Sequence, residues 1–123
     1  MEIEVSNGEI VDKLTILLIK QSKIKNKDKL NNINKEIIAI TEISDAIIPR
    51  DHLLFSQLLE VNKKLWDVED MIRAKESLRE FDETFINLAR LVYIVNDERA
   101  KIKKQINEST GSELMEEKSY ESY

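Results

Sequence analysis

Residues that interrupt regular backbone structure are almost absent from this chain. Its 123 residues include two glycines and one proline. An all-β sandwich needs many tight turns, which Gly and Pro usually supply, so this composition argues against one and favours long helices. Pro49 and Gly111 mark the expected ends of two of these helices.

Apolar side chains recur at helical spacing in four stretches separated by short polar connections. This pattern predicts an all-α fold, a four-helix antiparallel bundle of long helices that forms a single domain over residues 1–123. The expected helices span about 6–25, 28–48, 51–77 and 82–108, and a C-terminal tail follows over 112–123.

Capping residues support these helix starts. Ser6 and Glu9 have the spacing of a capping box, in which each side chain bonds the backbone amide of the other residue. Phe81 and Ile86 stand where a hydrophobic staple is expected around the start of the last helix. The other three helices have a plausible N-cap carboxylate: Asp28, Asp51 and Asp82.

The composition also restricts the compartment and the chemistry. The chain has no cysteine, which excludes disulfides, Cys-ligated zinc and iron–sulfur clusters. Its N-terminus lacks a basic region followed by an apolar one, so we expect a cytoplasmic protein with no membrane span. The net charge is −5, and no aromatic residues interleave with the lysines of residues 20–29. We therefore interpret that basic patch as a solvated turn, and expect no nucleic-acid partner.

The first helix is apolar on two sides. Leu14 and Leu17 lie on one face, whereas Ile16 and Ile19 point nearly the opposite way. Such a helix is either buried in the middle of the fold or meets another chain. We expect the second case, with a homo-oligomer formed through the first or second helix. Asp12 falls in the sector of the two isoleucines, where it could be no more than a first-turn carboxylate favoured by the helix dipole.

Polar residues also interrupt the apolar faces of the third and fourth expected helices. In the third helix they form the row Asn62, Trp66, Glu69, Arg73 and Glu76, in which Glu69 and Arg73 are well placed to pair. In the fourth helix an apolar half with Phe85, Ala89 and Val92 gives way to Asn96, Arg99, Lys103 and Asn107. If these helices fold back on each other, Arg99 comes near Asn62 and Trp66.

Two hypotheses account for this seam. In the first, its charges form partly buried ion pairs that fix helix register. In the second, the seam is a pocket for a phosphate or carboxylate. In that pocket Arg73, Arg99 and Lys103 would bind the anion, and Asn96 would orient it. Trp66 or Tyr93 would supply a flat wall, and Glu69 or Asp70 would hold Mg²⁺ or act as a base.

Catalysis has weaker support in the sequence. All-α nucleotide pyrophosphohydrolases bind Mg²⁺ through carboxylates spaced i, i+3 on facing helices, and five such pairs occur here. With 24 acidic residues, chance alone supplies about four or five. His52 is the only histidine, which makes it a poor metal ligand without cysteine or a second histidine. No metal or other cofactor is therefore expected, and Mg²⁺ belongs only to the alternative in which the protein is an enzyme.

Several strings occur together in a recognisable order. They are Gly8–Leu17, Leu65–Asp70, Ile72–Arg73, Lys75–Glu76, Phe85–Ile86, Leu88–Arg90, Tyr93, Asn96–Asp97, Arg99–Ala100 and Glu116–Tyr120. The chain resembles an uncharacterised family of short, single-domain helical proteins of bacteria and their phages, known only as a domain of unknown function. The resemblance implies an all-α fold and a complete protein, but no established activity, substrate or cofactor.

Together these observations favour a small cytoplasmic interaction or assembly module without catalysis, with a protein partner possible. The alternative is a small-ligand-binding protein or enzyme that acts on a phosphorylated or carboxylated metabolite, with Mg²⁺ if it resembles the pyrophosphohydrolases.

Overall fold

The computed structural model describes residues 1–112, which form four α-helices and no strand. The helices are α1 (Asn7–Lys23), α2 (Lys27–Ile47), α3 (Leu53–Ser77) and α4 (Glu83–Thr110). The all-α prediction is confirmed, and each helix begins and ends within two residues of its expected position. Apart from Ser112, the tail expected over 112–123 lies outside the described residues.

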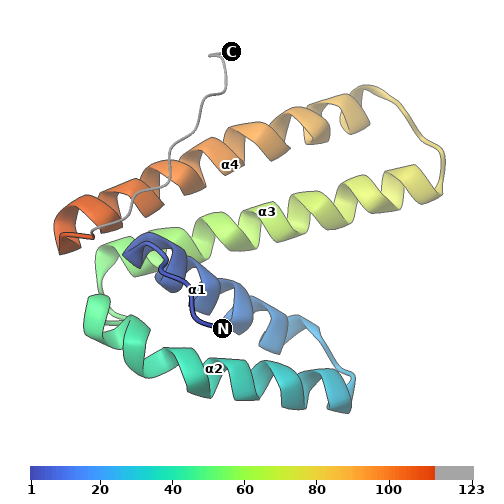
Figure 1. Ribbon diagram of the computed structural model, residues 1–123. Coiled ribbons are helices and arrows are strands. Elements are labelled where there is room, and N and C mark those ends of the chain that lie inside the picture. The colour runs from blue at the N-terminus through green and yellow to red at the C-terminus, as the bar shows by residue number, and fades with distance from the viewer. Residues whose placement is uncertain (113–123) are drawn as a thin grey trace.

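The helices form two hairpins, α1–α2 and α3–α4 (Figure 1). Helix α1 packs against all three other helices and lies between α2 and the α3–α4 hairpin. The hairpins meet where α1 begins, α2 ends, α3 begins and α4 ends, which we call the base. They diverge towards the α1–α2 and α3–α4 connections, which we call the two tips, so the bundle is open at one end.

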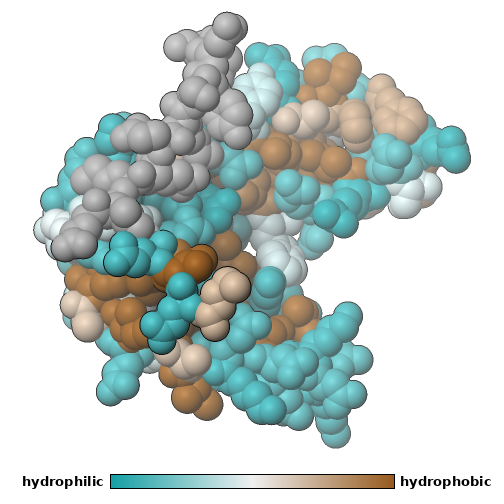
Figure 2. Space-filling view, viewed as in Figure 1, coloured by the Kyte–Doolittle hydropathy of each residue, from teal (hydrophilic) through white to brown (hydrophobic). Residues whose placement is uncertain are grey.

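The hydrophobic core lies at the base. Its buried members come from all four helices or their caps: Val11, Leu14, Ile48, Phe55, Leu58 and Ile106. In the space-filling view apolar side chains gather on the visible face of the base, and a notch separates the hairpins at the open end (Figure 2). The packing that holds the two hairpins together is therefore concentrated at one end of the molecule.

Both apolar faces of α1 find partners within the chain. Ile19, which belongs to the second face, is only 2% exposed, and Leu14 on the first face is fully buried. Burial of this helix therefore needs no second subunit, because α1 is the central helix of the fold. The reason for expecting an interface through α1 is thus removed, whereas the homo-oligomer itself stays a prediction.

Three helix ends have the expected caps. The Ser6 hydroxyl accepts a hydrogen bond from the Glu9 amide at 3.2 Å, and the Asp82 carboxylate accepts one from the Phe85 amide at 3.0 Å. Gly111 ends α4 with φ +68°, the left-handed conformation that glycine adopts most readily.

Two N-caps differ from the expected residues. Asn26 caps α2 through its side-chain oxygen, which accepts from the amide three residues later at 3.1 Å, and Asp28 lies inside the first turn. His52 caps α3 through Nδ1, which accepts from the Leu54 amide at 3.0 Å, where Asp51 was expected. In both cases two nearby polar residues could serve as the N-cap, and residue type alone does not decide which of them does.

Helices α1 and α4 approach each other closely at Gly8. The Gly8 amide donates to the buried Asn107 side-chain oxygen at 2.6 Å. A Cβ atom built on Gly8 would lie 2.5 Å from the Lys103 carbonyl oxygen. Only a residue without a side chain permits this approach, so Gly8 sets the distance between the two helices at the base.

We predict that Gly8→Ala lowers the free energy of unfolding by about 2–3 kcal/mol, because the added methyl group must push α1 and α4 apart. The control is Gly111→Ala, where no atom of residues 1–112 lies within 4 Å of the added methyl group and the positive φ opposes the substitution, at about 1 kcal/mol. Denaturant unfolding measures both values. Equal losses for the two variants would contradict the tight packing at Gly8.

An ion-pair cluster holds the α3–α4 connection. The Lys75 ammonium lies 2.9 Å from carboxylate oxygens of both Glu80 and Asp82. These hydrogen bonds raise the pKa of Lys75, and the bond from Lys75 lowers the pKa of Asp82, with help from the Phe85 amide. The Asp82 carboxylate is therefore held in its charged form while it caps α4.

We predict that Lys75→Met raises the pKa of Asp82, because the largest cause of its lowered pKa is removed. The measurement is an NMR titration of the Asp82 carboxyl carbon. In the parent, this group stabilises the fold above its unfolded pKa, and the contribution is lost as the pH falls through the folded pKa. An unchanged Asp82 pKa in the variant would show that the cap alone, rather than the ion pair, controls this carboxylate.

Candidate functional site

A buried ion pair joins α1 to α4. Asp12 is 1% exposed, and its carboxylate accepts hydrogen bonds from both Nε and Nη2 of Arg99, the first at 2.9 Å. This two-point geometry is the strong form of an arginine–carboxylate pair. It defines the position of α4 relative to the first half of α1.

Helix α3 completes the same network. The Asn62 amide nitrogen donates to the Asp12 carboxylate at 2.9 Å and to the Thr15 hydroxyl oxygen at 2.8 Å. The Thr15 hydroxyl in turn donates to the Asp12 carbonyl at 2.7 Å. Helices α3 and α4 therefore supply the partners that the buried carboxylate of α1 needs, and Thr15 holds the Asn62 amide in place beside it.

Lys103 lies one turn further along α4 and forms a second ion pair with α1. It is buried, and its ammonium lies 2.7 Å from the Glu9 carboxylate. Glu9, which was expected to complete the capping box, thus turns its carboxylate to α4. The charge of Lys103 is matched by an acidic partner on the neighbouring helix.

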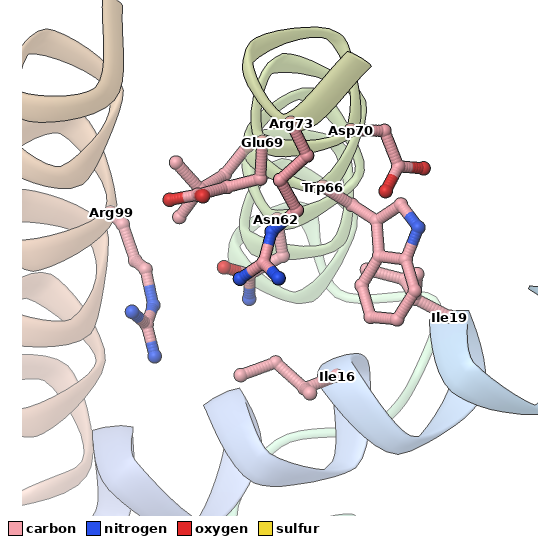
Figure 3. Close-up of a pocket in the computed structure, with 9 residues that line it drawn as sticks. Ile16, Ile19, Asn62, Trp66, Glu69, Asp70, Arg73 and Arg99 are labelled. Atoms are coloured by element: carbon pink, nitrogen blue, oxygen red, sulfur yellow. The ribbon is translucent and has the colours of Figure 1, made fainter. Parts of the chain in front are cut away.

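A pocket of about 480 Å³ opens between the hairpins, next to this network. It lies between α1 and α3, with Arg99 of α4 at one side (Figure 3). Its apolar lining consists of Ile16, Ile19, Leu65 and Trp66, and its polar lining consists of Asn62, Glu69, Asp70, Arg73 and Arg99. The pocket thus has an apolar surface next to charged groups of both signs.

The charged side chains of α3 diverge around the pocket. In Figure 3 Glu69 leans towards α4, Asp70 leans the other way beside Trp66, and the Arg73 guanidinium hangs between them above Ile16. Within residues 1–112, none of these three charged groups forms a hydrogen bond or an ion pair. The expected pair between Glu69 and Arg73 is therefore absent, and both charges face the pocket unmatched.

The structure separates the residues predicted for an anion pocket into two groups. Trp66, Glu69, Asp70, Arg73 and Arg99 line the pocket. The remaining three, Asn96, Tyr93 and Lys103, are not among its lining residues. Lys103 lies towards the base with Glu9, since one helical turn past Arg99 carries it away from the open end.

The structural role of Asp12 is larger than the sequence analysis predicts. It was noted only as a first-turn carboxylate, yet it is the acidic partner around which three helices meet. The available signal was its position in an otherwise apolar sector of α1, because a carboxylate placed there must be paired when the face is buried. The partners Asn62 and Arg99 were themselves visible as polar breaks in apolar faces.

The acidic residues of the site do not form a metal centre in the described part of the chain. No three Asp, Glu or His side chains within residues 1–112 lie close enough together to hold a metal ion. Glu69 and Asp70 lean to opposite sides of α3, so they do not share a ligand position. The geometry thus gives no support to the predicted Mg²⁺ site.

Comparison with known proteins gives one match. A family model described as a family of unknown function (DUF6165) matches residues 1–123. The chain belongs to this family. Searches of curated proteins and of solved structures give no match. The family carries no assigned activity, so any functional conclusion has to come from the site itself. In addition, no helix within residues 1–112 has the length and apolar character needed to cross a membrane.

We predict that Arg99→Met lowers the free energy of unfolding by about 2–4 kcal/mol, because it leaves the Asp12 carboxylate buried without its cation. Adding Asp12→Asn should recover part of this loss, since the unpaired charge is then removed. The control is Lys23→Met, which breaks an exposed pair with Asp67 and should cost less than about 0.5 kcal/mol. Denaturant unfolding provides all three values. A loss for Arg99→Met as small as that for Lys23→Met would overturn the structural role of the pair.

Proposed function

We propose that this protein binds a small organic ligand in the pocket between its hairpins and that it does so without catalysis. The observation that carries the proposal is the pocket lining. Apolar side chains lie beside three charged groups that make no ion pair within residues 1–112. Sites for small molecules have this composition, with a mostly apolar surface and a few polar groups that orient the ligand.

The charges favour a ligand that carries both signs. Asp12 matches Arg99, so Arg73 is the cation of the lining that has no acidic partner within residues 1–112. Glu69 and Asp70 would repel a multiply charged phosphate. A carboxylate bound by Arg73 and a protonated amine bound by Glu69 satisfy both signs. Of the two ligand classes expected from the sequence, the carboxylated class is therefore the better match.

The apolar lining favours a ligand with a flat or branched apolar body. Trp66 offers its ring above Ile19, with Ile16 nearby (Figure 3). A volume of about 480 Å³ is within the range of small-molecule sites. We therefore propose an α-amino acid with an aromatic side chain, or a compound of the same plan, as the ligand class. The cytoplasmic location expected from the sequence is part of this proposal.

Binding is preferred to catalysis because the pocket offers little for a reaction. A pyrophosphohydrolase-like site needs carboxylates on facing helices, whereas Glu69 and Asp70 both belong to α3. His52, the only histidine, caps α3 at the base. No nucleophile–base pair is found among the residues that line the pocket.

The second candidate function is an assembly module, the function first favoured by the sequence. Leu78 and Phe81 at the α3–α4 tip are 67% and 56% exposed. Exposed apolar side chains at a projecting tip are typical of surfaces that contact another protein. Ligand binding and assembly are compatible, because the pocket and the tip involve different residues.

We predict that phenylalanine or tryptophan raises the melting temperature of the protein by several degrees at about 100 times its dissociation constant. Two matched probes test the charges: 3-phenylpropionate lacks the amine, and phenethylamine lacks the carboxylate. Each should bind about tenfold more weakly, because one charged contact is lost. Isothermal titration calorimetry measures the affinities.

Variants test the position of the ligand. Arg73→Gln should weaken binding of phenylalanine and 3-phenylpropionate but leave binding of phenethylamine unchanged. Glu69→Gln should weaken binding of phenylalanine and phenethylamine but leave binding of 3-phenylpropionate unchanged. The control is Arg90→Gln, an exposed residue of α4 that is not among the pocket lining residues. If no amino acid or analogue shifts the melting temperature, the proposed function is wrong. If 3-phenylpropionate binds as tightly as phenylalanine, the pocket remains a ligand site, but the ligand is not a zwitterion.

A further inference from the structure

The two tips of the molecule carry opposite charges. Four exposed lysines surround the α1–α2 connection, at positions 23, 25, 27 and 29, together with one acidic residue, Asp28. Four exposed acidic residues surround the α3–α4 connection, at positions 76, 80, 82 and 83, with Lys75 and Arg79 as the basic residues among them. Both tips lie on the open side of the molecule (Figure 1).

The two tips of one chain cannot meet. The Lys23 ammonium, at the end of α1, lies 3.7 Å from the Asp67 carboxylate of α3. The end of α1 at the basic tip is therefore level with Asp67 along the axis of α3. Helix α3 continues ten residues further, to Ser77, which at 1.5 Å per residue is about 15 Å. This distance exceeds the Debye length of about 8 Å at physiological salt. The acidic tip therefore projects beyond the basic tip of its own chain.

We propose that two copies of this chain associate through their open ends, with the basic tip of each copy against the acidic tip of the other. A twofold rotation about an axis perpendicular to the plane through the two tips turns the open ends towards each other and places opposite tips together at both contacts. Such an arrangement is closed and uses the same surfaces on both copies, as most soluble oligomers do. It is independent of the ligand pocket and identifies a partner for the assembly function.

Apolar side chains at the tips add to the charges. Leu78 and Phe81 are largely exposed at the acidic tip, and the Phe81 ring contacts Phe85 edge-on, with 5.2 Å between ring centroids. The half-buried Ile24 and the aliphatic parts of the lysine side chains lie at the basic tip. Contact between the two tips would bury these apolar side chains with opposite charges around them.

Charge reversal tests the proposal with full-length protein. One variant carries Lys25→Glu and Lys27→Glu at the basic tip, and the other carries Glu76→Lys and Glu83→Lys at the acidic tip. None of these four residues forms an ion pair within residues 1–112. The control carries Lys101→Glu and Lys104→Glu, the same charge change as in the basic-tip variant but on exposed residues of α4 towards the base. Circular dichroism and thermal melting establish that each variant is folded.

Sedimentation equilibrium at low and at high salt gives the oligomeric state. We expect a dimer for the parent and the control at low salt and dissociation at high salt, because exposed ion pairs are screened. Each tip variant should dimerise at least about tenfold more weakly. An equimolar mixture of the two tip variants should restore a dimer, since one copy then has two acidic tips and the other two basic tips.

Two outcomes would overturn the proposal. A parent protein that is monomeric at low salt across the concentration range would leave the lysines as a solvated turn or a site for another polyanion. A dimer that persists in both tip variants would place the interface elsewhere. The salt dependence of the parent decides the matter even if a variant fails to fold. Ligand binding is measured separately, so either proposal can fail without the other.

Discussion

The buried carboxylate of Asp12 is the constraint on which the arrangement of the helices depends. A charge removed from water needs a cation and hydrogen-bond donors close to it. Arg99 supplies the cation from α4, and Asn62 supplies a donor from α3. The core packing at the base excludes water, but it tolerates small shifts between apolar surfaces. The Asp12 network tolerates them poorly, because hydrogen bonds are directional, so it selects one register among three helices.

The same network separates two roles that look alike in the sequence. Arg99 and Arg73 both interrupt apolar helical faces, and both line the pocket. The guanidinium of Arg99 is engaged by a buried carboxylate and forms part of the pocket wall. That of Arg73 makes no ion pair within residues 1–112 and projects into the opening. A structural ion pair and a candidate ligand group therefore lie side by side, and the two hypotheses considered for the seam each describe part of it.

Much of the fold follows from local rules, whereas the site depends on distant contacts. The scarcity of Gly and Pro, the Ser6 and Asp82 caps and the Gly111 stop predict four helices with nearly correct ends. Periodicity also placed Arg99 near Asn62 and Trp66. It could not assign Asp12 to Arg99, because 87 residues separate them and pairing depends on how the hairpins cross. Nor could it show that α1 is central, since an apolar second face fits an oligomer equally well.

The core, the Gly8 contact and the Asp12 network join the two hairpins at or near the base. A small rotation of one hairpin about the base therefore becomes a larger displacement at its tip. Helix α3 has 25 residues and a length of about 37 Å. A rotation of about 5° at the base moves the far end of such a helix by about 3 Å. That displacement is close to the diameter of a water molecule. The width of the opening is therefore sensitive to packing changes at the base that leave every helix intact.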